Sequence, residues 1–123
     1  MTIRRNGAAF RALYESLGLS QEDVRRILGL SDVKRIRERV HDIKDVRPEE
    51  WRAIKDLQRQ AEDRADRLVA GCEGRERVAL AYSTANTWKA KIHNLAIRLA
   101  ARDLSDAGTE VELRLKDPHD RIK

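Results

Sequence analysis

The chain is poor in aromatic residues, in cysteine and in long apolar runs. Only 4% of its 123 residues are aromatic, whereas 38% are charged. Any hydrophobic core is therefore aliphatic and modest, which favours a chain that is completed by a partner subunit. Cys72 is the only cysteine, so an intrachain disulfide is excluded and a reducing compartment fits.

Apolar runs of membrane-spanning length are missing, and the N-terminal residues carry no hydrophobic signal core. We therefore expect a cytoplasmic protein without a membrane partner. The formal net charge is +5 and the isoelectric point is near 9.7. This balance suits a polyanionic partner, although both signs of charge are abundant.

The sequence also lacks the motifs of catalysis and cofactor binding. It has no glycine-rich phosphate loop, no dinucleotide fingerprint and no grouping that would activate a nucleophile. His41, His93 and His119 are scattered, without metal-ligand spacing to one another or to Cys72. We expect no enzymatic activity, no cofactor and no metal site.

What is present is a pair of short helices over residues 20–41. Ser20 is a good N-cap, and Asp23 three residues later predicts a capping box. Gly29 is suited to the left-handed conformation that ends a helix, and Ser31 offers a second N-cap. The pattern predicts two helices joined by a tight turn.

The second of these helices has two unlike faces. Val33, Ile36 and Val40 fall on one face, and at about 100° per residue Lys34, Arg35 and Glu38 point away from it. Arg39 and His41 flank the polar residues, and Arg37 lies nearer the edge of the apolar stripe. An apolar back and a cationic front are what a helix needs to enter the major groove of DNA, although a charged face can also be merely solvated.

Residues 18–31, GLSQEDVRRILGLS, resemble the Cro/C1-type (XRE-like) helix-turn-helix of transcriptional regulators. Arg25 departs from the small residue usual in that family. The resemblance implies that Gln21 touches a DNA phosphate and that Asp32, Val33, Lys34 and Arg35 read bases. The full set of predicted DNA-binding residues is Ser20, Gln21, Ser31, Asp32, Val33, Lys34, Arg35, Arg37, Glu38 and Arg39.

Further helices are predicted on both sides of this motif. Residues 8–17 form an apolar stripe that should pack behind it, and a mobile arm over residues 1–7 carries Arg4 and Arg5. A long helix is expected from Pro48 to about Ala70. The predicted first domain, residues 1–70, is therefore a helix-turn-helix bundle with a long linking helix.

Beyond residue 71 the apolar period changes from 3.6 to 2. Residues 77–82 and 111–116 alternate as strands, and a helix ending near Asp106 separates them. The predicted fold is mostly α with a small α+β C-terminal part, a strand–helix–strand unit within residues 71–123.

A lone two-strand unit is marginal as an independent fold, so we expect it to pair with a second chain. This order resembles, more loosely, the small repressors of the anti-CRISPR-associated type, which have a C-terminal dimerisation domain. The residues predicted to form the homodimer are Leu68, Val78, Leu80, Trp88, Ile92, Leu95, Leu99, Val111 and Leu113.

The sequence thus predicts a homodimeric, autoregulatory repressor that binds an inverted-repeat operator in double-stranded DNA through residues 32–40. Two alternatives stay open. One is an antitoxin-type module whose C-terminal half grips a protein partner, and the other is RNA binding through the same basic helix.

Overall fold

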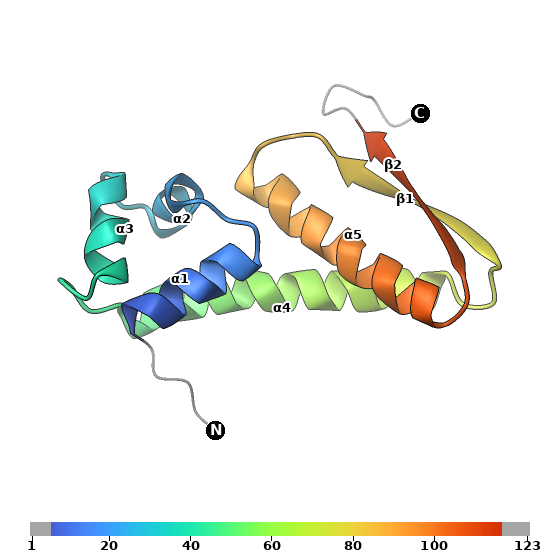
Figure 1. The fold of residues 1–123 in the computed structure, drawn as a ribbon, viewed down its shortest axis with the longest axis horizontal. Coiled ribbons are helices and arrows are strands. Elements are labelled where there is room, and N and C mark those ends of the chain that lie inside the picture. The colour runs from blue at the N-terminus through green and yellow to red at the C-terminus, as the bar shows by residue number, and fades with distance from the viewer. Residues whose placement is uncertain (1–5, 117–123) are drawn as a thin grey trace. The chain divides into compact units, whose positions relative to one another are not determined.

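The computed structural model describes residues 6–116 of the chain. The predicted arm residues Arg4 and Arg5 lie outside this range. Figure 1 shows the order of elements: α1 (Gly7–Ser16), α2 (Gln21–Leu28), α3 (Val33–Val40), α4 (Pro48–Gly71), β1 (Arg77–Ser83), α5 (Trp88–Asp106) and β2 (Glu110–Lys116). The expected fold class, mostly α with a small α+β C-terminal part, is confirmed.

The chain divides into two compact units, Met1–Gln58 and Arg59–Lys123. The boundary falls inside α4 and not after residue 70, where the sequence analysis placed it. The reason is that the second half of α4 belongs to the C-terminal core: Ala65 is buried in it, and Leu68 and Val69 pack against it.

The N-terminal unit is closed by aliphatic and aromatic side chains from all of its helices. Phe10 packs edge-on against Tyr14, with ring centroids 5.6 Å apart, and lies 6.5 Å from the ring of Trp51. The buried apolar residues of this unit are Phe10, Leu13, Tyr14, Leu17, Leu19, Val24, Ile36, Ile54 and Leu57.

The start of α1 lies against the end of α3. Gly7 is buried, and a Cβ atom built on it would overlap the backbone carbonyl oxygens of Arg39 and Val40. Its N–H donates to Oδ1 of Asp42 at 2.8 Å. Asn6 and Gly7 therefore belong to the capped start of a helix and not to the predicted arm.

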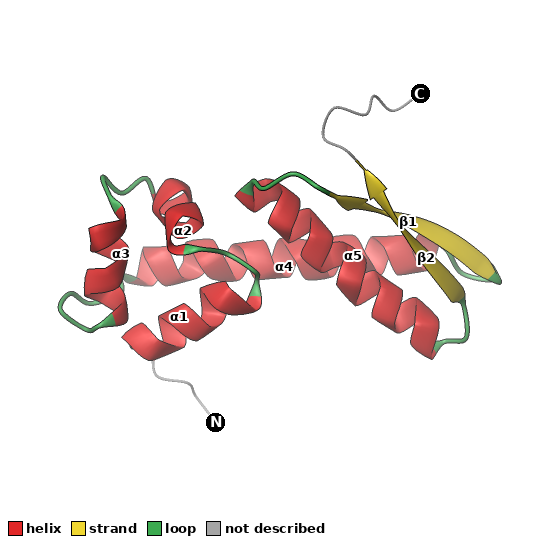
Figure 2. Ribbon diagram, turned by 45° about the horizontal axis from the view of Figure 1, so that its top comes forward, coloured by secondary structure: helices red, strands yellow, loops and turns green. Residues whose placement is uncertain are grey.

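The C-terminal unit is a strand–helix–strand unit, as predicted. β1 and β2 pair in parallel, from Arg77 opposite Glu110 to Ser83 opposite Lys116. Figure 2 shows the two strands side by side. A parallel pair needs a crossover connection, which α5 supplies.

One face of the sheet is buried against helices. Val78 and Leu80 of β1 form a core with Ala65 of α4 and with Ile97, Ala100 and Leu104 of α5. Asn94 of α5 is a buried polar residue whose side chain bonds to both backbone groups of Ser83, at 2.8 and 3.0 Å. These contacts attach the end of β1 to the helix.

Candidate nucleic-acid interface

The first helix of the predicted motif begins at a complete capping box. The Ser20 hydroxyl accepts from the N–H of Asp23 at 3.1 Å, and the Asp23 carboxylate accepts from the N–H of Ser20 at 2.9 Å. Two of the backbone N–H groups left open at a helix start are satisfied in this way. The prediction for Ser20 and Asp23 is confirmed, and Ser20 itself stays exposed.

The turn between α2 and α3 is braced by a side chain that the sequence analysis did not assign. Gly29 ends α2 in the left-handed conformation, with φ 69°. The Arg25 guanidinium donates to the Leu30 carbonyl at 3.1 Å and pairs with Glu22 at 2.5 Å. Arg25, the residue that departs from the family pattern, therefore links the body of α2 to the turn.

Glu22 is the electrostatic centre of this brace. Hydrogen bonds from Arg25, with a further contribution from Arg26, lower the pKa of Glu22 from its ordinary value to about 2. The Glu22 carboxylate therefore stays ionised, and the link between α2 and the turn persists, over the whole physiological pH range.

The second helix starts one residue later than its predicted cap. Asp32, not Ser31, is the N-cap of α3, and its side chain makes no capping hydrogen bond. Ser31 and Asp32 are both exposed. The predicted role of Ser31 as a second cap is therefore wrong, because the extended residue before the helix is Asp32.

The apolar back of α3 anchors it in the core, as expected. Ile36 is fully buried, and Val33 and Val40 are partly buried. This arrangement leaves the opposite side of the helix facing away from the interior.

Arg39 was predicted to bind DNA, but the structure buries its side chain. It is 4% exposed, and its guanidinium forms a two-pronged ion pair with Glu50 at 2.8 and 2.9 Å. A third bond, at 2.8 Å, reaches the carbonyl oxygen of Arg35. Arg39 therefore faces the interior and ties the last turn of α3 to the first turn of α4.

Glu50 lies in the first turn of α4, where a carboxylate complements the helix dipole, but its main contacts are with individual groups. Burial by itself would raise the pKa of Glu50, but hydrogen bonds from the Arg39 side chain and the Arg47 N–H lower it below its ordinary value. The Arg47 contact measures 3.0 Å. The carboxylate thus caps α4 while it neutralises Arg39.

The exposed front of α3 is smaller than predicted. Lys34, Arg35 and Arg37 are exposed. Glu38 is not part of this front, since its side chain is only 14% exposed and lies 3.4 Å from Arg35. The N–H groups of Ile43 and Lys44 donate to the Glu38 carbonyl, so the following loop returns to this part of the helix. We call Lys34, Arg35 and Arg37 the α3 cationic front.

Gln21, the predicted phosphate contact, is half-buried at the start of α2. Burial raises the pKa of Tyr14, and a hydrogen bond from the Gln21 side chain acts in the opposite direction. The Gln21 side chain thus lies within hydrogen-bonding reach of the Tyr14 hydroxyl. The structure brings Gln21 into the same unit as the α3 cationic front.

The predicted dimerisation residues divide into two groups. Val78, Leu80 and Ile92 are at most 8% exposed in the single chain, and Leu68, Leu99 and Val111 pack against its C-terminal core. The single chain already buries the first three of these side chains and partly buries the other three, and their role in a homodimer stays a prediction. Trp88 and Leu95 are half-buried.

Leu113 is the member of the predicted set that remains exposed, at 49%. Leu115, which the sequence analysis left out, is more exposed still, at 76%. Both lie on β2, and the strand pattern that placed Leu113 on an apolar face applies equally to Leu115.

The described part of the chain, residues 6–116, holds no group of three or more side chains able to bind a metal. Within it, His93 is positioned by the Ala81 carbonyl at 3.0 Å and by Arg64 at 3.4 Å. Among the same residues, no helix combines the length and the apolar content required to cross a bilayer.

Comparison with known proteins returned no assignment: the chain matches no protein-family model and no curated protein.

Proposed function

We propose that the protein is a sequence-specific DNA-binding regulator that inserts α3 into the major groove. The observation that carries this proposal is the division of α3 into a buried back and the α3 cationic front. Ile36 is fully buried, whereas Lys34, Arg35 and Arg37 are exposed on the same eight-residue helix.

The size and support of α3 are consistent with this role. An α-helix with its side chains is about 10–12 Å across, which fits a major groove about 12 Å wide, and the eight residues of α3 at 1.5 Å each make it about 12 Å long. The Arg39–Glu50 pair and the Arg25 brace hold both ends of the helix to the rest of the unit. A helix that is already fixed loses little conformational freedom on binding.

The resemblance of residues 18–31 to the XRE-like motif supports the same mode of binding. On that basis Lys34 and Arg35 contact base edges or phosphates near the start of α3, and Gln21 contacts a phosphate. Arginine prefers the O6 and N7 atoms of guanine, so we expect a guanine in each recognised site. Arg39 is excluded from this role by its buried ion pair.

Selection of bound duplexes from a random pool tests the proposal. On the selected duplex, Arg35→Ala should weaken binding by about 1–3 kcal/mol and relax one base preference. Each lost phosphate contact should reduce the slope of log affinity against log salt by about 0.9. Arg52→Ala is the matched control, since it removes one exposed positive charge from α4 in the same unit.

Three outcomes would contradict the proposal. One is the absence of any enriched duplex. Another is an Arg35→Ala variant that binds as tightly and as selectively as the Arg52→Ala control. The third is preferential displacement of the duplex by structured RNA, which would favour RNA as the ligand of the same front.

A further inference from the structure

We infer that β2 pairs in antiparallel fashion with β2 of a second copy of the chain, across a two-fold axis at Leu113. The free edge of β2, its exposed leucines and the order of charges along the strand support this pairing. This surface is distinct from α3, and pairing through it does not require DNA binding.

The hydrogen bonds of the sheet show which edge is open. Glu110 donates its N–H to Glu76, and Lys116 accepts from Thr84, so the even-numbered residues of β2 bond to β1. The N–H and C=O groups of Val111, Leu113 and Leu115 therefore point away from β1. Within residues 6–116 these outward groups make no hydrogen bond.

The opposite edge of the sheet is occupied over the second half of β1. Along β1 the outward backbone groups of Ser83 bond to the Asn94 side chain, and the Ala81 carbonyl bonds to His93. Strand addition there would have to displace side chains of α5. An unpaired strand edge readily accepts another strand, so β2 is the edge available for pairing.

The apolar side chains of β2 are left partly uncovered. Val111 packs against the C-terminal core, but Leu113 is 49% exposed and Leu115 is 76% exposed. In the parallel register Leu113 lies opposite Leu80, which is buried, so these leucines share the helix-covered face of the sheet. A second copy of β2 would extend this face and cover both leucines.

The charges of β2 specify the partner and the register. The strand reads Glu110, Val111, Glu112, Leu113, Arg114, Leu115 and Lys116, acidic in its first half and basic in its second. Antiparallel pairing centred on Leu113 sets Glu110 opposite Lys116 and Glu112 opposite Arg114 of the other copy. Shifting the centre to residue 112 or 114 would instead oppose two glutamates or two arginines, which is unfavourable.

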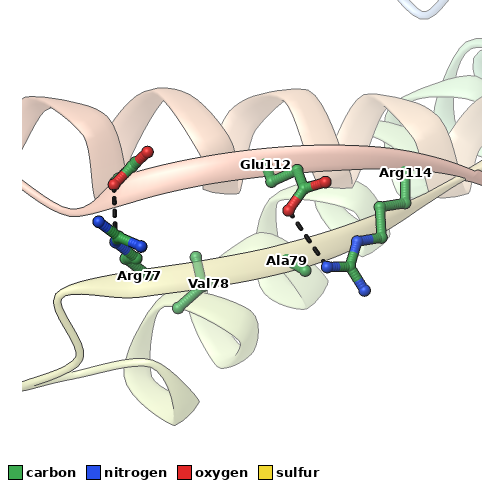
Figure 3. A pocket seen from close by; sticks show the side chains of 6 residues that line it. Arg77, Val78, Ala79, Glu112 and Arg114 are labelled. Atoms are coloured by element: carbon green, nitrogen blue, oxygen red, sulfur yellow. Dashed lines mark hydrogen bonds and ion pairs between the residues drawn. The ribbon is translucent and has the colours of Figure 1, made fainter.

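The same register is compatible with the outward N–H and C=O groups of Val111, Leu113 and Leu115. It sets Leu113 opposite Leu113 and Val111 opposite Leu115 as hydrogen-bonded pairs, because these residues have outward N–H and C=O groups, and it leaves Glu112 and Arg114 as non-hydrogen-bonded pairs. The polar side chains lie on the other face, and Figure 3 shows Arg77, Glu112 and Arg114 among them. These three residues help to line a shallow pocket of about 410 Å³. Within one chain Glu112 and Arg114 pair with each other at 3.2 Å, both about two-thirds exposed. Such an exposed pair exchanges partners at little cost.

Charge reversal tests the pairing. Glu112→Arg alone, or Arg114→Glu alone, places like charges opposite each other twice in a homodimer. Either change should raise the dissociation constant of the homodimer about tenfold or more. A mixture of the two single variants should form a heterodimer that restores the affinity. Only contact between residues 112 and 114 of different chains predicts that rescue. Association is measured on the full chain by analytical ultracentrifugation.

Cysteine cross-linking tests the register independently. In a Cys72→Ser background, Leu113→Cys should form an intermolecular disulfide, because directly paired Cα atoms lie about 5.5 Å apart. Leu115→Cys is the matched control. Its two copies would lie about 14 Å apart along the strands, at 3.4 Å for each of four residues, and should not cross-link.

The control is informative because Leu115 is more exposed than Leu113, so random collision would favour the opposite result. A monomer at high micromolar concentration would overturn the inference. So would cross-linking through Leu115→Cys in preference to Leu113→Cys, or a pair of reversal variants that fails to form a heterodimer. None of these results would bear on duplex binding by the α3 cationic front.

Discussion

Replacing Arg39 with methionine should destabilise the N-terminal unit strongly, although the residue lies on a helix rich in exposed cations. The Arg39 side chain is 5% exposed and that of Glu50 is 8% exposed. Arg39→Met would leave the Glu50 carboxylate buried with only the Arg47 N–H as a partner. Removing one member of a buried ion pair costs about 3–5 kcal/mol.

That loss is large beside the 5–15 kcal/mol by which most domains are stable. The double variant Arg39→Met/Glu50→Leu should recover most of it, since two apolar side chains leave no unpaired charge. The recovery should fall short by about 1 kcal/mol, because Glu50 also accepts from Arg47. A double-mutant cycle should therefore report a coupling of several kcal/mol.

The assay is urea unfolding followed by the fluorescence of Trp51, which packs against Phe10 in the same unit. A Trp88→Phe background removes the second tryptophan, so that the signal reports on the N-terminal unit. Arg37→Met is the matched control, because Arg37 is an exposed arginine two residues away and should change stability by no more than about 0.5 kcal/mol. If Arg39→Met cost no more than Arg37→Met, or if the two single losses simply added in the double variant, the assignment of Arg39 to the interior would be refuted.

Three further predictions concern local contacts. Gly7→Ala should destabilise the N-terminal unit by about 1–3 kcal/mol in urea unfolding, because the new Cβ would overlap the backbone carbonyl oxygens at the end of α3. Gly71→Ala is the control: its new Cβ would meet no atom within 4 Å, so it should be neutral or slightly stabilising. Asn94→Leu should lower the free energy of unfolding by about 1–3 kcal/mol and speed hydrogen exchange at the Ser83 amide, because it removes both hydrogen bonds between the Asn94 side chain and the Ser83 backbone. An unchanged exchange rate at Ser83 would contradict these two hydrogen bonds. Because the pKa of Glu22 is lowered from 4.5 to about 2, its ionised carboxylate contributes stability that is complete above about pH 4.5 and is lost as the pH falls towards 2. Glu22→Gln should therefore reduce the loss of stability at acidic pH. An unchanged pH dependence of stability would argue against the Arg25 brace.

Local features of this protein follow from its sequence because they depend on neighbours a few residues apart. The structure has the capping box predicted from Ser20 and Asp23, and Gly29 ends its helix in the predicted left-handed conformation. The apolar back of α3 and the alternation of β1 likewise follow from periods of 3.6 and 2. These two periods were also enough to predict the strand–helix–strand order of the C-terminal half.

The direction of Arg39 could not be read in this way. At about 100° per residue it lies roughly 60° from Ile36, at the border between the buried and exposed sides of α3. Its partner Glu50 stands eleven residues further along the chain, beyond the loop that leads into α4. Only the packing of α4 against α3 decides that this arginine is buried while Arg37 is exposed.

The C-terminal half shows the same division between local and tertiary information. Alternation placed Val78, Leu80, Val111 and Leu113 on apolar faces, but it did not distinguish a face filled by the chain's own helices from one left open. The structure buries Val78 and Leu80 under α4 and α5 and leaves Leu113 and Leu115 exposed. The sequence determines which residues share a face, because side-chain direction is a local property of the backbone. The tertiary structure alone decides which faces are covered, because burial depends on segments distant in the chain.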